Sequence, residues 1–214
     1  MKKGHRTRNL MPYICPYAII KSKNAKFIKA IINNKISWYS NSTMTINEQE
    51  KSELEEIYQT LLNNDKVKQM MEIPMHRGSN CYIHSFKVAK LAIKRALTKK
   101  SADLKILLYA AIFHDYYLYD WRKDRSKIKH HGKNHPYLAA SQAKRDFDIP
   151  LESMEIIKAH MWPLNFKEFP RTREAKILTI SDKRIATKEA LTSKRFKLKR
   201  REKELKYISR LFDK

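Results

Sequence analysis

One stretch of the sequence, residues 106–113, is apolar nearly all round and reads Ile-Leu-Leu-Tyr-Ala-Ala-Ile-Phe. It is too short to cross a membrane, so it predicts a helix through the middle of a folded domain. No stretch of the sequence shows the sustained alternation of apolar and polar residues that marks a half-buried strand. The sequence therefore predicts an all-α protein, an irregular bundle of about six or seven helices.

The helix starts around this run carry capping residues or early prolines. They are placed at Asn47, at Ser79 or Asn80, at Ser101, at Asn134 before Pro136, at Pro150 and at about Thr172. Residues 116–133 are aromatic and then basic, without apolar periodicity. This segment is predicted to be a long loop, and loops of that length are commonly functional.

The length of 214 residues suits one domain with extensions. Residues 1–44 lack clear periodicity and are predicted to be a basic extension of uncertain order. Residues 45–190 form the predicted domain, and residues 191–214 a basic C-terminal helix.

The formal net charge of +24 is concentrated at the two ends of the chain. Residues 1–35 hold nine Lys or Arg and no acidic residue, and residues 188–214 hold eleven basic against four acidic residues. Such ends can attract nucleic acid, an acidic membrane surface or a polyanionic substrate. A lysine-rich composition with solvated ends explains the charge equally well.

Composition excludes several classes of protein. Three glycines are too few for a glycine-rich phosphate loop, so a bound phosphate would be held by metal or by basic side chains. Cys15 and Cys81 have neither zinc-site spacing nor the density of a disulfide scaffold, which suits a reducing compartment. With no run of transmembrane length, we expect a soluble, cytoplasmic protein.

Metal-ligand side chains recur at predicted helix ends and on apolar helix faces. They are His84, His114, Asp115, His135, His160 and Asp182. Imidazole and carboxylate without thiolate suit Fe, Mn, Co, Ni or Zn, and six ligands are too many for one open catalytic centre. Two divalent ions that share Asp115 would use them all. Singly, each residue is more often an ordinary buried histidine or a chance His-Asp pair, so the ordered set carries the prediction.

The order of these residues resembles the HD superfamily of metal-dependent phosphohydrolases. The family pattern is His, then His-Asp, then Asp, and bimetallic branches add two histidines before the last position. The matching stretches are YIHSFKVA at 82–89, LYAAIFHD at 108–115, NHP at 134–136, IIKAH at 156–160 and ILTISD at 177–182. The resemblance covers about residues 75–190.

The resemblance implies a first metal on His84, His114, Asp115 and Asp182, and a second on Asp115, His135 and His160. A water activated by the ions would attack phosphorus in a phosphomonoester or phosphoanhydride of a nucleotide-like small molecule. Asp115 is then a catalytic residue as well as a ligand. His131 is a further catalytic candidate, either orienting a ligand or protonating the leaving group.

The phosphate-binding residues are less well defined by the resemblance. Some branches carry a lysine soon after the His-Asp pair, but residues 116–121 here are Tyr-Tyr-Leu-Tyr-Asp-Trp. These rings could stack a nucleobase or cover the end of the core. By their nearness in sequence to the ligands, the candidates for phosphate contact are Arg122, Lys133 and Lys183.

Two other functions remain open from the sequence. The basic termini and aromatic loop suit a nucleic-acid-binding or nucleic-acid-cleaving protein. A non-catalytic HD binding module is the third possibility, and the intact set of six ligand positions weighs against it. The Gly-Tyr-Pro signature of cyclic-di-nucleotide phosphodiesterases is missing after His160, where Met-Trp-Pro-Leu stands, so that substrate is disfavoured.

Overall fold

A computed structural model describes residues 46–75, 79–98, 102–123 and 130–191. All of these residues lie in one compact unit of the chain. The predicted extension over residues 1–44 and the predicted C-terminal helix beyond residue 191 lie outside them. The described segments contain helices and no strand, which confirms the all-α prediction.

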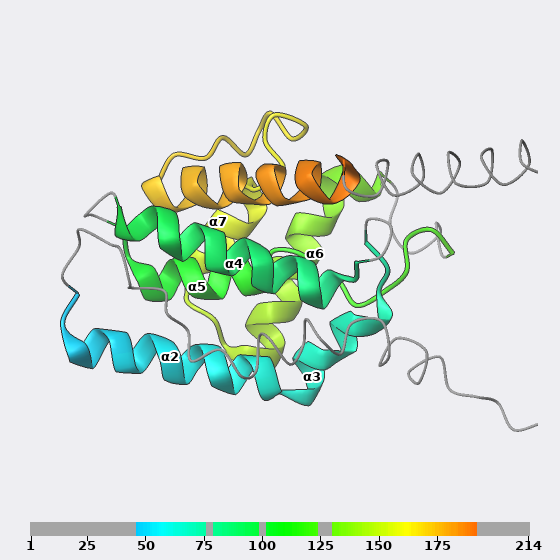
Figure 1. Cartoon of the computed structure of the whole chain (residues 1–214). Helices are drawn as coiled ribbons and strands as arrows, with labels where there is room; N and C mark the ends of the chain where they lie inside the picture. The colour runs from blue at the N-terminus through cyan, green and yellow to red at the C-terminus, as the bar shows by residue number, and fades with distance from the viewer. Residues whose placement is uncertain (1–45, 76–78, 99–101, 124–129, 192–214) are drawn as a thin grey trace, which may run out of the picture. The chain divides into compact units, whose positions relative to one another are not determined.

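The structure describes the following helices, given in chain order. They are α2 (Glu48–Asn63), α3 (Asp65–Lys68), the 3-10 helix η1 (Gln69–Glu72), α4 (Cys81–Leu97), α5 (Leu104–Phe113), α6 (His131–Phe147) and α7 (Leu151–Ala159). A last helix spans residues 173–191. Figure 1 shows it in orange beside α4, and side-chain contacts of Glu189 with Ser79 and Lys87 join the two.

Most helices begin at a residue whose side chain caps the first turn, as the sequence indicated. Asn47 accepts a hydrogen bond from the backbone N–H of Glu50 at 2.7 Å. Asn80, the second of the two candidates, caps α4. Helix α5 was predicted to follow a cap at Ser101. It begins two residues later, and Asp103 caps it.

Helix α6 also differs from the prediction, since it begins at His131 rather than after Asn134. The backbone of His130 is left-handed, with φ of 54°, and its carbonyl accepts the N–H groups of Lys133 and Asn134. Pro136 therefore marks the early part of the helix and not its first residue. The predicted loop over 116–133 is correspondingly shorter, and His131 belongs to a helix.

Helix α5 is the central element, packed against α4, α7 and α2. Its residues Leu107, Leu108, Ala111 and Ile112 are fully buried, as the apolar run predicted. The chain leaves α5 at His114 and Asp115, so this pair lies inside the bundle. Tyr116 and Tyr117 follow and are buried too, so these two rings cover the end of the core. No helix in the described segments is both long and apolar enough to cross a membrane.

Candidate metal centre

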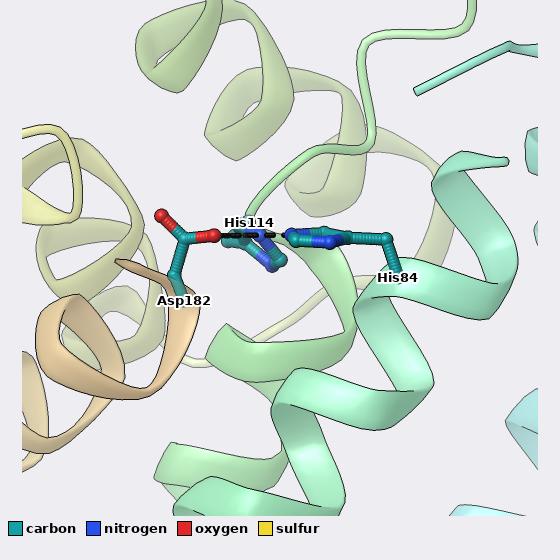
Figure 2. A group of neighbouring side chains, drawn as sticks. All are labelled: His84, His114 and Asp182. Atoms are coloured by element: carbon teal, nitrogen blue, oxygen red, sulfur yellow. Dashed lines mark hydrogen bonds and ion pairs between the residues drawn. The ribbon is translucent and has the colours of Figure 1, made fainter. Parts of the chain in front are cut away.

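The six predicted ligands come together as two neighbouring groups. His84, His114 and Asp182 form the first, and Asp115, His135 and His160 the second, with the ligand atoms of each group within 4.8 Å of one another. Figure 2 shows the first group, in which the rings of His84 and His114 lie beside the carboxylate of Asp182. The side chain of Asp182 is 13% exposed, and the other five residues are buried.

The six side chains lie either at the ends of helices or on helix faces that point into the bundle. His114 and His160 are the C-cap residues of α5 and α7, and Asp115 follows His114 directly. His84 lies in the first turn of α4, and Asp182 lies on the helix over 173–191. Residues more than 90 positions apart thus meet because the ends of several helices converge.

Three of the histidines are held in the same orientation by backbone carbonyls. The Nδ1 atoms of His114, His135 and His160 lie 2.9, 2.9 and 2.7 Å from the carbonyl oxygens of Ala111, His131 and Ile157, respectively. A carbonyl oxygen can only accept, so Nδ1 must carry the hydrogen. When these rings are neutral, Nε2 carries no hydrogen and has an unshared lone pair, and this is the form of histidine that binds metal.

These bare nitrogens have no ordinary partner for their lone pairs. The Nε2 atoms of His135 and His160 face each other at 3.2 Å, and two neutral rings have no proton to share there. Nε2 of His114 is buried and forms no hydrogen bond within the described residues. A divalent cation would turn each of these lone pairs into a bond, so the donor set fits a metal with nitrogen and oxygen ligands.

Asp115 lies between the two groups, with one carboxylate oxygen toward each. Its Oδ1 is 3.1 Å from Nε2 of His135 and 3.8 Å from Nε2 of His160. Its Oδ2 is 3.3 Å from Nε2 of His114. One carboxylate thus faces histidine nitrogens of both groups.

Burial and neighbouring charged groups shift the pKa values of several residues in the site. Burial favours the neutral ring of His84, but hydrogen bonds to Asp182 and Glu189 outweigh it and raise its pKa to about 9. Despite burial, the nearby imidazoles of His114 and His84 hold the pKa of Asp182 well below its usual range. Burial, then the charges of His114 and His135, lowers the pKa of His160 to about 3. Without metal, His84 is therefore protonated beside an ionised Asp182.

His131, the second catalytic candidate, lies beside the second group. Its Nδ1 is 2.6 Å from the hydroxyl of Tyr119. Its ring stacks on His135 at 4.8 Å between centroids and on Trp121 at 5.1 Å. Burial, followed by the charge of His135, lowers its pKa to about 4, so the ring is neutral at pH 7.

Of the three predicted phosphate contacts, Lys183 lies nearest to a ligand. Its ammonium group donates to the carbonyl of His160 at 3.4 Å and to that of Trp162. The guanidinium of Arg122 donates to the carbonyl of Met75 and lies 5.4 Å from the ring of Trp121. Lys133 is exposed in the first turn of α6. A phosphate-binding role for all three stays a prediction.

Sequence reasoning missed Glu189, which lies 3.0 Å from Nδ1 of His84. It follows Asp182 by seven residues, or about two helical turns, so both carboxylates share one face of the last helix. That spacing was the available signal. The family pattern ends at Asp182, so it does not mark Glu189.

A family model for the HD domain matches residues 81–187, half of the chain. The match begins with α4, ends in the last helix and includes all six predicted ligands. The chain therefore belongs to the HD domain family, as the sequence resemblance implied. This is a family of metal-dependent hydrolases, so divalent metal is the expected cofactor. No curated protein matched the sequence, and no solved structure matched the chain.

Proposed function

We propose that this protein is a metal-dependent phosphohydrolase that cleaves a phosphomonoester or phosphoanhydride in a nucleotide-like small molecule. The observation that carries the proposal is the set of buried imidazole nitrogens with bare lone pairs around Asp115. A purely structural cluster would share protons between these rings, whereas here the Nδ1 contacts use the ring hydrogens elsewhere.

Two ions would share the carboxylate of Asp115. The first would be held by His84, His114, Asp115 and Asp182, and the second by Asp115, His135 and His160. Such ions, of Fe, Mn, Co, Ni or Zn, supply a water of lowered pKa and polarise a phosphoryl oxygen. The helix ends fix the ligands before substrate arrives, so little reorganisation is needed.

The remaining side chains suggest how substrate is held. Lys183 is anchored on the carbonyl of His160, next to the second group, and is the first choice for a phosphate contact. Arg122 and Lys133 would bind more distal phosphates. His131 is neutral, and the Tyr119 hydroxyl would donate a hydrogen bond to its Nδ1. Its Nε2–H would then donate a hydrogen bond to the leaving oxygen of the substrate.

The test combines metal analysis with a substrate screen. Protein purified without added metal is analysed for its elements, then assayed with nucleotides and phosphoesters in the presence of Mn, Fe, Co, Ni, Zn or Mg. Wild type should bind metal and release phosphate or a nucleotide, and Asp115→Asn should lose both properties. Asp120→Asn is the matched control, because its carboxylate accepts the backbone N–H of Arg122 and lies in the same loop.

The outcomes separate the proposal from its rivals. Full activity in metal-free wild type would refute it. Metal binding without hydrolysis of any substrate in the screen would favour the non-catalytic HD module. A cytoplasmic location also stays a prediction, and it would be checked by fractionation of cells that express the full chain.

Nucleic-acid binding is a second candidate function, favoured by one face of the helix over 173–191. Eight exposed residues share this face, five of them cations and none acidic: Arg173, Lys176, Ile180, Lys183, Arg184, Thr187, Lys188 and Leu191. Parts of the face line two surface hollows of about 440 and 380 Å³. Arg184 and Leu191, in the middle of this face, lie on the opposite side of the helix from Asp182. Six more cations follow in residues 194–201.

Salt dependence tests this second candidate. Lys176→Gln with Arg184→Gln should reduce the slope of log affinity against log salt by about 2 for duplex DNA, since each phosphate contact adds about 0.9. The control, Lys51→Gln with Lys68→Gln, removes the same charge from lysines paired with Glu48 and Asp65. An equal slope in the two double variants would contradict a specific role for this face.

A further inference from the structure

Glu189 is a partly buried carboxylate outside the six predicted ligands, and it makes three polar contacts. Its Oε2 lies 3.0 Å from Nδ1 of His84. Its Oε1 accepts from the ammonium of Lys87 at 2.7 Å and from the hydroxyl of Ser79 at 3.2 Å. The side chain is 9% exposed. Both oxygens are therefore engaged, and the carboxylate is held in one orientation.

His84 differs from the other three histidines in the group that its Nδ1 meets. In His114, His135 and His160 this atom faces a carbonyl oxygen of the preceding turn. Nδ1 of His84 instead faces the carboxylate of Glu189, which comes from another helix. Glu189 therefore places a full negative charge at the position where the other three histidines meet a carbonyl dipole.

The last helix thus holds His84 from both sides of its ring. Asp182 lies 3.0 Å from Nε2, and Glu189 lies 3.0 Å from Nδ1. A carboxylate can only accept, so the hydrogen of the metal-binding tautomer belongs on Nδ1. A charged acceptor at that atom also makes Nε2 a stronger donor to a metal than a carbonyl would.

We propose that Glu189 is a positioning residue of the first metal group, which holds His84 with Nδ1–H toward Glu189 and Nε2 toward the ion. The inference rests on the proposed metal site. Ser79 and Lys87 act through Glu189, because they fix Oε1 while Oε2 faces the ring. A merely structural role, a tie between the last helix and α4, would affect folding without affecting the histidine.

The experiment measures zinc binding by calorimetry in full-length wild type, Glu189→Ala and Glu189→Gln. A residue that hydrogen-bonds the other ring nitrogen of a metal-binding histidine typically raises metal affinity about 10- to 100-fold, so Glu189→Ala should lose that much. Glu189→Gln should lose less, since its amide oxygen still accepts from Nδ1–H. The control is Glu155→Gln, which removes the same charge from an exposed pair with Lys158 and should leave affinity unchanged.

Proton NMR of the zinc-loaded proteins supplies a readout that a structural tie would not change. The Nδ1–H proton of His84, assigned by its loss in His84→Gln, should be downfield and slow to exchange in wild type and Glu189→Gln. It should exchange rapidly in Glu189→Ala. Either an unchanged affinity or an unchanged proton signal in Glu189→Ala overturns the inference alone. Wild type that takes up no zinc overturns the proposed function with it.

Discussion

Replacing Asp115 by asparagine should remove most of the stability that divalent metal confers on the protein. The carboxylate lies between the two groups, with Oδ1 3.1 Å from His135 and Oδ2 3.3 Å from His114. The substitution removes an anionic oxygen from each group while keeping the shape of the side chain. The loss should exceed that caused by removing a residue that only hydrogen-bonds a ligand, so we expect metal affinity to fall by at least about 100-fold.

The size of the effect follows from mass action. Metal at about 100 times its dissociation constant stabilises the folded wild type by about 2.7 kcal/mol. For a chain of this length that corresponds to a rise in Tm of about 5–11 °C. The same concentration would only match the dissociation constant of Asp115→Asn, which leaves about 0.4 kcal/mol and a rise below about 2 °C.

The assay is thermal unfolding with and without Mn, Co or Zn, after removal of bound metal with a chelator. Each variant is compared with its own metal-free form, so any change in intrinsic stability cancels. Asp120→Asn should keep the full rise of the wild type. A rise in Asp115→Asn equal to that of the wild type would refute the placement of metal around Asp115.

Three further predictions concern pH, substrate and the core. Without metal, the free energy of unfolding should fall as pH drops from about 6.5 toward 4, because the unfolded chain binds protons that folded His131 and His160, with pKa values of about 4 and 3, exclude. The free energy of unfolding should also fall as pH rises from 6.5 to 9. Over this range folded His84, with a pKa of about 9, still binds a proton that the unfolded chain has lost. Urea titrations at pH 5, 6.5 and 9 check both limbs, and a flat profile would contradict them. Lys183→Gln should raise KM about tenfold or more with metal content unchanged, as steady-state kinetics and elemental analysis would show; an unaltered KM would remove Lys183 from the phosphate site. Leu108→Ala, at a fully buried position of α5, should cost about 2–5 kcal/mol in chemical denaturation, whereas Leu164→Ala, at a half-exposed side chain, should cost much less.

The all-helical class and the central helix were predictable because they depend on local pattern. The apolar run 106–113 admits burial on every side, and α5 is buried accordingly. Asn47 and Asn80 act as caps because a short polar side chain before a helix meets unpaired N–H groups. The start of α6 was misplaced, because the left-handed turn at His130 has no distinct sequence signal of its own.

The convergence of the six metal-ligand candidates was predictable only through their order along the chain. Spacing places His114 and Asp115 at the end of one helix, but no local rule brings Asp182 to within 3.0 Å of His84. The contacts of Glu189 and Tyr119 depend on packing between elements, so the sequence did not reveal them. His131 was expected in a loop, and its stacking on His135 follows from the earlier start of α6.

Anomalous scattering from crystals grown with Mn or Zn tests the central claim most directly. The account predicts two peaks in the anomalous difference map, one among His84, His114, Asp115 and Asp182, and one among Asp115, His135 and His160. Elemental analysis of the same protein should give about two ions per chain. The account would be contradicted by a map with no peak at either group, obtained from folded protein whose metal is bound at another place.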